Sequence, residues 1–417
     1  MSARGIPLLS PLRTSAFKRL WTGASLSVLA DQAFLVSLTW LVLSITGSGA
    51  SLGLVLAVAS VPGIVFTPLG GVLSDRMSPV VVMAAANVAR AVLMCSLTLL
   101  VLTDTTRIWH VYLLAGGLSA LDALYYPASM TAVPTVVGRE RLEAANALVQ
   151  GAEQISGVLG PALAGVVLAL YGVWINLGAN TILFLVSAMV LAAAPRAIHP
   201  SVRATVAADA AEGTDARVSG TLSSVVQGAR YAWRDPVIRT IMLILVGINF
   251  AMAGPIYVGG SVLAETRLGG ASAFGTLVAV GSVGAMAGAA AAGTFGRVRR
   301  RGAVELVSTA AMGVGVAALA FVSSLLMAGS LVVFIGMIAS FMAVMNISWL
   351  QERSEPGVTG RVMSLAMFSA VALDPISYVL AGVLVELDLG AVFLASGGLL
   401  LFTALLGATS RSMRTAD

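Results

Sequence analysis

Charged side chains are scarce in this sequence of 417 residues, because Asp, Glu, Lys and Arg together make up only 10% of it. A soluble globular domain carries about 25% charged residues and about 45–50% apolar ones. Here 58% of the residues are hydrophobic and the mean hydropathy is +0.96. No water-soluble globule of this length has enough polar surface to cover that much hydrocarbon. The composition excludes soluble enzymes, nucleic-acid-binding domains and secreted disulfide scaffolds, and it indicates an integral membrane protein.

Cysteine and histidine are almost absent. The one cysteine, Cys95, lies inside an apolar run, and the two histidines are His110 at a loop edge and His199 in a polar stretch. A disulfide framework, a thiolate metal site or a multi-histidine site needs several such residues. The sequence also has no Walker sequence and no Ser-His-Asp or Cys-His set. We therefore expect no metal, no cofactor, no nucleic-acid partner and no enzymatic activity.

Long apolar runs are what the sequence has in abundance. A spanning helix needs about 20 predominantly apolar residues, and six such runs precede a polar stretch while six follow it. They are 22–45, 51–73, 79–102, 109–134, 143–170, 173–194, 238–263, 271–295, 303–325, 329–350, 361–385 and 389–409. We predict an all-α membrane protein with twelve transmembrane helices in two six-helix bundles, at 1–194 and 238–417. Residues 195–237 would form a cytoplasmic linker, whose second half has amphipathic spacing.

The positive charges are distributed unevenly among the predicted loops. If the N-terminus is cytoplasmic, 21 of the 24 Lys and Arg residues fall in inside segments, Arg107 and Arg267 fall outside, and Arg90 lies within a span. Positive residues concentrate in cytoplasmic loops, and adding or removing one span would destroy this asymmetry. We therefore predict that both termini are cytoplasmic.

Two glycine landmarks recur at one spacing. Gly71 and Gly293 each precede an inside loop, and their separation along the chain equals that between Gly138 and Gly360. The equal offsets indicate a duplicated unit. Transporters built from such repeats bind substrate near the middle of the membrane, between the halves.

Five ionisable residues lie deep inside predicted spans. They are Asp31, Arg90, Asp122, Glu153 and Asp374. Each costs about 2.5–3.5 kcal/mol at a helix centre, so five facing lipid would cost on the order of 15 kcal/mol, as much as the whole stability of a protein. We therefore expect them to face the bundle interior, to pair, or to be neutral. Because burial favours the neutral form of a carboxyl, one or two of the four acids could bind and release a coupling proton.

The neighbours of these acids suggest different roles. Asp122 shares a helical face with Tyr125, Tyr126 and Ser129, which is typical of a polar cavity wall. Glu153 could be a proton carrier or simply the partner of Arg139 or Arg90.

Asp374 precedes Pro375, where a broken hydrogen-bond ladder admits water, so it could be a hinge group instead. Arg90 would hold one of the acids, with binding of an anionic substrate as the alternative.

The loop Gly70-Gly71-Val-Leu-Ser-Asp75-Arg76, together with twelve predicted spans and a central linker, resembles the major facilitator superfamily. The resemblance implies a gate in which Asp75 and Arg76 meet the start of the eleventh span, where Arg361 lies. An anion gains about 0.3–1 kcal/mol at a helix N-terminus, so this contact would hold the inside closed.

Further motifs resemble the drug–proton antiporter branch that contains macrolide-efflux proteins and enterobactin exporters. They are Pro127-Ala128, Val133-Pro134, Gly138-Arg139-Glu140-Arg141-Leu142, Arg234-Asp235-Pro236 and Thr359-Gly360-Arg361-Val362. The fifth span is similar to the stretch that exporters of the superfamily carry there, through Gly157, Gly160, Pro161 and Gly165. Small residues allow close helix approach and Pro161 kinks the helix, and ordinary packing is the alternative reading.

Aromatic and amide residues in the spans are candidates for the wall of a substrate cavity. They are Phe34, Trp40, Tyr125, Tyr126, Asn249, Tyr257, Asn346, Trp349 and Phe368. Such a wall favours bulky amphiphiles over sugars, which need dense hydrogen-bond donors.

We therefore expect a proton-coupled exporter of amphiphilic drug-like or natural-product molecules, driven by a proton gradient and working by alternating access. It would be a monomer in contact with membrane lipids, in the cytoplasmic membrane of a bacterium. The alternatives are a dedicated siderophore or antibiotic exporter, a lipid or lysolipid facilitator without proton coupling, and a non-transporting membrane sensor.

Overall fold

The computed structural model describes residues 7–137, 141–194, 230, 233–295, 300–354 and 359–409, and these are helical apart from short connections. Eleven of the helical segments are long and apolar enough to span a membrane. A twelfth, α4 (Ile108–Val136), is long enough as well, but Asp122 and His110 lower its hydropathy. The predicted all-helical, twelve-segment fold is thus confirmed. Most of the predicted linker, including all but three residues of its amphipathic second half, lies outside the described residues.

The chain forms two compact units. Unit 1 comprises Met1–Gly47 and Val58–Gly213, and unit 2 comprises Ser48–Ala57 and Thr214–Asp417. The helix α2 (Gly49–Arg76) therefore contributes its first turns to unit 2 and the rest to unit 1. The predicted bundles at 1–194 and 238–417 did not include this division of α2.

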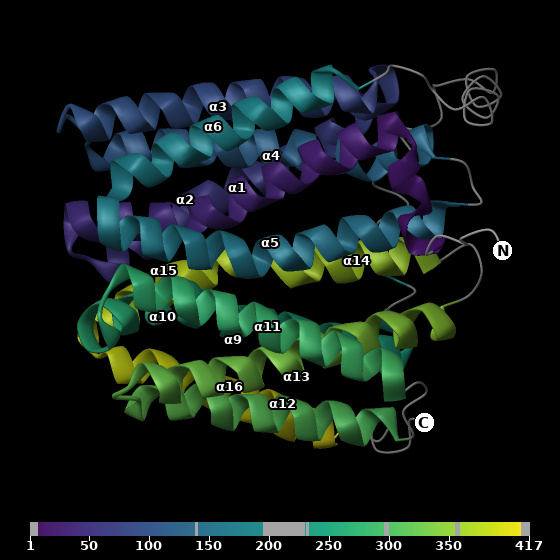
Figure 1. The fold of residues 1–417 in the computed structure, drawn as a ribbon. Helices are drawn as coiled ribbons and strands as arrows, with labels where there is room; N and C mark the ends of the chain where they lie inside the picture. Colours follow the sequence, from purple (N-terminus) through teal and green to yellow (C-terminus); the bar gives the residue numbers. More distant parts are fainter. Residues whose placement is uncertain are drawn as a thin grey trace, which may run out of the picture. The chain divides into compact units, whose positions relative to one another are not determined.

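Unit 1 contains one short and several long helices that lie side by side (Figure 1). They are η1 (Pro7–Arg13), α1 (Ser15–Thr46), the later part of α2, α3 (Pro79–Leu102), α4, α5 (Leu142–Tyr171) and α6 (Val173–Ala192). Gly47 ends α1 with a φ of 60°, a left-handed conformation that glycine adopts without steric cost. Pro79 begins α3, where the missing N–H of proline leaves no hydrogen bond unmade.

Unit 2 contains the remaining helices. They are α9 (Pro236–Gly254), η4 (Pro255–Gly259), α10 (Gly260–Leu263), η5 (Ala264–Leu268), α11 (Ala271–Phe295), α12 (Arg301–Ala318), η6 (Leu319–Phe321), α13 (Leu325–Arg353), α14 (Thr359–Val371), α15 (Asp374–Leu387) and α16 (Leu389–Thr409). Asp235 caps α9 by accepting hydrogen bonds from the backbone N–H groups of Val237 and Ile238, at 2.8 and 3.2 Å.

Two segments of unit 2 differ from the expected simple spans. The segment expected at 238–263 continues to Leu268, and η4 and η5 within it are π-helical. Pro255, which opens η4, lacks the N–H of an α-helical turn, and this favours a locally wider helix. The segment expected at 361–385 is divided, because α14 ends at Val371 and α15 starts at Asp374 beside Pro375.

Helix positions repeat along the chain at the spacing that the glycines indicate. The start of α11 follows the start of α2 (271 against 49) by the same interval as the start of α12 follows that of α3 (301 against 79). The segment from α9 to η5 also ends one such interval after α1 (268 against 46). These equal offsets support a duplicated architecture.

Candidate functional site: a charged cavity in unit 1

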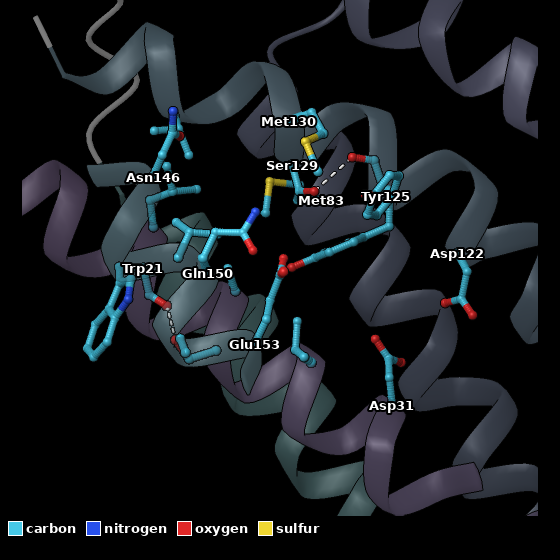
Figure 2. Close-up of a pocket in the computed structure, with 18 of the residues that line it drawn as sticks. Trp21, Asp31, Met83, Asp122, Tyr125, Ser129, Met130, Asn146, Gln150 and Glu153 are labelled. Carbon is cyan, nitrogen blue, oxygen red and sulfur yellow. Dashed lines mark hydrogen bonds between the residues drawn. The ribbon is translucent and has the colours of Figure 1, made fainter. Parts of the chain in front are cut away.

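A cavity of about 640 Å³ lies among α1, α3, α4 and α5, with its lining residues all in unit 1. Apolar and aromatic side chains form much of its wall, and polar groups enter from all four helices. Figure 2 shows Asp31 and Asp122 facing one another at one end, while Gln150 and Glu153 point into the space from α5. The cavity therefore combines a hydrocarbon wall with a concentrated set of carboxyl groups.

Arg90 of α3 joins two of these carboxyl groups. Its guanidinium is only 1% exposed, and its Nη2 forms an ion pair with Asp122 of α4. Its Nη1 lies 3.6 Å from Asp31 of α1. The two carboxylates are far more open, with side chains 38% and 52% exposed for Asp31 and Asp122. One buried guanidinium thus lies against two carboxylates that are exposed to the cavity.

A chain of hydrogen bonds holds the guanidinium in place. Arg90 Nη1 donates to Ser27 Oγ at 3.0 Å and to Asn87 Oδ1 at 3.1 Å. The Asn87 amide nitrogen donates to Ser187 Oγ at 2.8 Å, and Ser187 donates to the Gly23 carbonyl at 2.6 Å. This chain links α1, α3 and α6, and it fixes the position of the cation in a protein interior where an unpaired charge is costly.

An aromatic ring covers one face of Arg90. The guanidinium carbon lies 4.4 Å from the centroid of the Tyr125 ring and 5.6 Å from that of Phe184. Both distances fall within the range of cation–π attraction. Tyr125 is 5% exposed, and its hydroxyl, although near Ser27 and Asn87, makes no hydrogen bond of regular geometry among the described residues. The ring face, rather than the hydroxyl, is the part of Tyr125 that serves the site.

Glu153 adds a third acid to the cavity. It lines the cavity from α5, and within the described part of the chain it forms no ion pair. Arg139, one of its two candidate partners, lies outside the described residues, and Arg90 pairs with Asp31 and Asp122 instead. With all groups ionised, three carboxylates face one guanidinium, so the cavity carries excess negative charge.

The glycine-containing stretch of α5 lies against α1 next to Asp31. A Cβ atom on Gly160 would lie 2.7 Å from the Cβ of Gln32 and 3.2 Å from the backbone nitrogen of Ala33. Gly157, Pro161 and Gly165 are buried in the same helix, and α5 is continuous through Pro161. Close packing of α5 on α1 therefore positions the segment that carries Asp31.

The predicted aromatic and amide residues of the cavity wall are distributed over several places. Tyr126 lines the unit 1 cavity, whereas Tyr257 lines a separate apolar cavity of about 240 Å³ in unit 2. Asn346 and Trp349 are buried in unit 2 and line neither of these two cavities. Four further predicted residues line neither of these two cavities: Phe34, Trp40, Asn249 and Phe368.

Asp374 begins α15, directly before Pro375. The rings of Tyr257 and Tyr378 meet edge to face with centroids 6.3 Å apart, and Tyr378 follows Asp374 by four positions on α15.

The residues of the predicted gate belong to α2 and α14. Gly71 lies in α2, and the side chains of Asp75, Arg76 and Arg361 lie outside the described residues. The contact between these residues stays a prediction.

Two polar residues of the interior, Gln150 and Glu305, were not predicted from the sequence. Gln150 enters the cavity one turn before Glu153, and this i, i+3 spacing of polar residues on α5 was the available signal. Glu305 is completely buried in α12 and accepts a hydrogen bond from Asn346 at 3.0 Å. Glu305 lies two residues after the start of the predicted span 303–325, where a charged residue is expected to face the membrane surface.

A multi-span helical fold with repeated halves and a charged cavity inside a bundle defines a membrane transporter. Residues 20–373 match the sequence pattern of the Major Facilitator Superfamily. The chain belongs to this family.

Two relatives carry names that describe efflux or export. The multidrug efflux pump Tap of Mycolicibacterium fortuitum is 25% identical over 399 residues, which cover 92% of each chain. The enterobactin exporter EntS of Shigella boydii serotype 18 is 25% identical over 378 residues, or 90% of this chain and 86% of the relative.

Among solved structures, the nucleoside transporter NupG aligns with a TM-score of 0.72 at 16% identity, covering 96% of this chain and 100% of that one. The peptide transporter POT in complex with sulfate has a TM-score of 0.68 at 12% identity, covering 95% and 94%. At these identities, the two structures show a shared fold alone.

Proposed function

We propose that this transporter is a proton-coupled exporter of amphiphilic molecules that works by alternating access in the bacterial cytoplasmic membrane. One observation carries the proposal: Asp31 and Asp122 share Arg90 at the end of a cavity that also contains Glu153. Both relatives described above are exporters by name.

The excess of acids over bases supplies the coupling. Arg90 neutralises one carboxylate at most, so ionised Asp31, Asp122 and Glu153 would leave two uncompensated charges in a low-dielectric site. A proton or a cationic substrate relieves that repulsion, and each therefore competes with the other for the same oxygens. Competition of this kind is what exchange of protons for substrate requires.

The lining predicts the class of substrate. Trp21, Tyr126, Met83 and Met130 offer aromatic and adaptable apolar surface, while the carboxylates attract positive charge. We expect amphiphilic cations and neutral drug-like molecules to bind better than anions. The proton gradient serves as the energy source, and we expect the transporter to act as a monomer surrounded by lipid.

A dedicated siderophore exporter is the second candidate, because enterobactin exporters match the chain as closely in identity as the multidrug pump does. Such a protein would transport one natural product and ignore lipophilic cations. The negative cavity favours the first proposal.

A liposome assay with the purified protein tests both candidates. An acid interior should drive accumulation of lipophilic cations or macrolides, and an ionophore that abolishes the pH gradient should stop it. Transport of a siderophore alone would support the second candidate. Substrate movement that ignores the gradient would contradict proton coupling.

A further inference from the structure

Glu305 is a buried carboxyl that the charged cavity does not use. It lies on α12 in unit 2, its exposure is 0%, and it lines neither of the two cavities described above. Its Oε1 accepts a hydrogen bond from the side-chain nitrogen of Asn346 on α13, at 3.0 Å. A fully ionised carboxylate with a single neutral donor is poorly compensated at such a position.

The nearby charges do not compensate Glu305. Arg301 precedes it by one turn of α12, but both terminal nitrogens of Arg301 lie against Glu352, at 3.1 and 3.0 Å. Within the described ranges Glu305 forms no ion pair. The packed neighbour α16 carries no charged residue, and the other charged residues of α12 and α13 pair elsewhere, Arg301 with Glu352 and Arg353 with Asp235.

Two oxygens at this site lack a donor. Glu305 Oε2 and Asn346 Oδ1 are both buried and have no hydrogen-bond partner among the described residues. Both are acceptors when the acid is ionised, so neither can satisfy the other. A proton on Glu305 Oε2 turns that oxygen into a donor. Its acceptor would be Asn346 Oδ1, the oxygen of the same amide whose nitrogen already donates to Glu305 Oε1. A neutral acid and an amide are complementary in this way.

We propose that Glu305 and Asn346 form a proton-binding site in unit 2, in which the carboxyl stays neutral and donates its O–H to the amide oxygen. The proton remains bound throughout transport and joins α12 to α13. The site is separate from Asp31, Asp122 and Glu153, whose carboxyl groups face a cavity.

Infrared spectroscopy of the purified full-length protein tests this directly and independently of transport. A neutral carboxyl has a carbonyl stretch that an ionised carboxylate lacks. At neutral pH, Glu305→Gln should lose such a band, whereas Glu265→Gln, a control on an exposed glutamate of the same unit that leaves the pair of Arg301 and Glu352 intact, should retain it. In D2O the band assigned to Glu305 should shift slowly, because its proton is sealed from solvent. Loss of carboxylate absorption in Glu305→Gln, with the neutral band unchanged, would overturn the proposal.

The proton-to-substrate ratio of Glu305→Gln and the infrared band of Asn346→Leu test the proposal further. Glu305→Gln should retain gradient-driven transport and its ratio of protons to substrate, and a reduced ratio would show that the proton of Glu305 moves. If Glu305→Gln does not fold, Asn346→Leu removes the acceptor and should shift the neutral band of the otherwise intact acid. An unshifted band in that variant would contradict the bond between Glu305 and Asn346.

Discussion

Arg90 and Asp122 form an ion pair between α3 and α4 in which the guanidinium is sealed from solvent and the carboxylate is half exposed to the cavity. This difference in exposure implies different roles for the two residues. Arg90 is fixed by Ser27 and Asn87, whereas Asp122 can be approached by a proton or a ligand. Competition at this site therefore acts on the carboxylate side of the pair.

Asp122→Asn should abolish most gradient-driven transport. Arg90 keeps Asp31, Ser27 and Asn87, so the variant should fold, but one proton-binding oxygen pair is lost. We expect at least about a tenfold lower rate, equivalent to ~1.4 kcal/mol in activation free energy. Initial rates in acid-interior liposomes measure it.

The control for this variant is Asp104→Asn, an exposed loop residue with a φ of 51° that asparagine also tolerates. Its transport rate should equal that of the wild type. The double variant Asp31→Asn/Asp122→Asn leaves Arg90 without an anion, which should cost about 3–5 kcal/mol of stability. Full transport by Asp122→Asn would rule out this acid as a coupling group.

Tyr125 should matter through its ring and not through its hydroxyl. The ring lies 4.4 Å from the Arg90 guanidinium carbon, while the buried hydroxyl makes no regular hydrogen bond in the described structure. Tyr125→Phe should therefore be as stable as the wild type or more so. Tyr125→Leu should lose about 1–2 kcal/mol from the cation–π contact. Thermal unfolding in detergent compares them, and equal losses in both variants would contradict this assignment.

Glu386 on α15 should stabilise the start of α2 within unit 2. Its carboxylate accepts hydrogen bonds from Ser48 Oγ at 2.8 Å and from the Ala50 backbone nitrogen at 3.1 Å. An anion at a helix N-terminus stabilises the unpaired N–H groups there, so Glu386→Ala should cost about 0.5–1 kcal/mol. Unfolding midpoints measure this cost, and the exposed Glu265→Ala is the control. Identical midpoints for the two variants would contradict a capping role.

The sequence was sufficient to predict the spans and the charged residues of the site, because a charge in an apolar run is conspicuous. It could not predict that Arg90 serves both Asp31 and Asp122, since that depends on how α1, α3 and α4 rotate against one another. The repeat was readable from the two glycine pairs because their spacing equals the offset between the starts of α2 and α11 and between those of α3 and α12.

Other features required the three-dimensional packing. Glu305 follows the arginines at 297–301 and has the sequence context of a membrane interface, and only contact with α13 shows that it is buried. The π-helical turns after Pro255 were also hidden, because an apolar run has the same composition in an α-helix and in a π-helix. Asn346 and Trp349 suit a cavity by residue type, yet they line neither of the two cavities described above.

Gly160→Val should disturb the acid site from a neighbouring helix. Its Cβ would lie 2.7 Å from the Cβ of Gln32 and 3.2 Å from the backbone nitrogen of Ala33, so α1 must move beside Asp31. Overpacking of this kind costs about 1–3 kcal/mol. Gly151→Ala on the same helix meets nothing within 4 Å and should be neutral or stabilising, because alanine favours helices over glycine. Unfolding midpoints and transport rates compare the two variants. If Gly160→Val keeps both values while Gly151→Ala does too, close packing of α5 on α1 does not position Asp31, and the glycine stretch of α5 must serve another purpose.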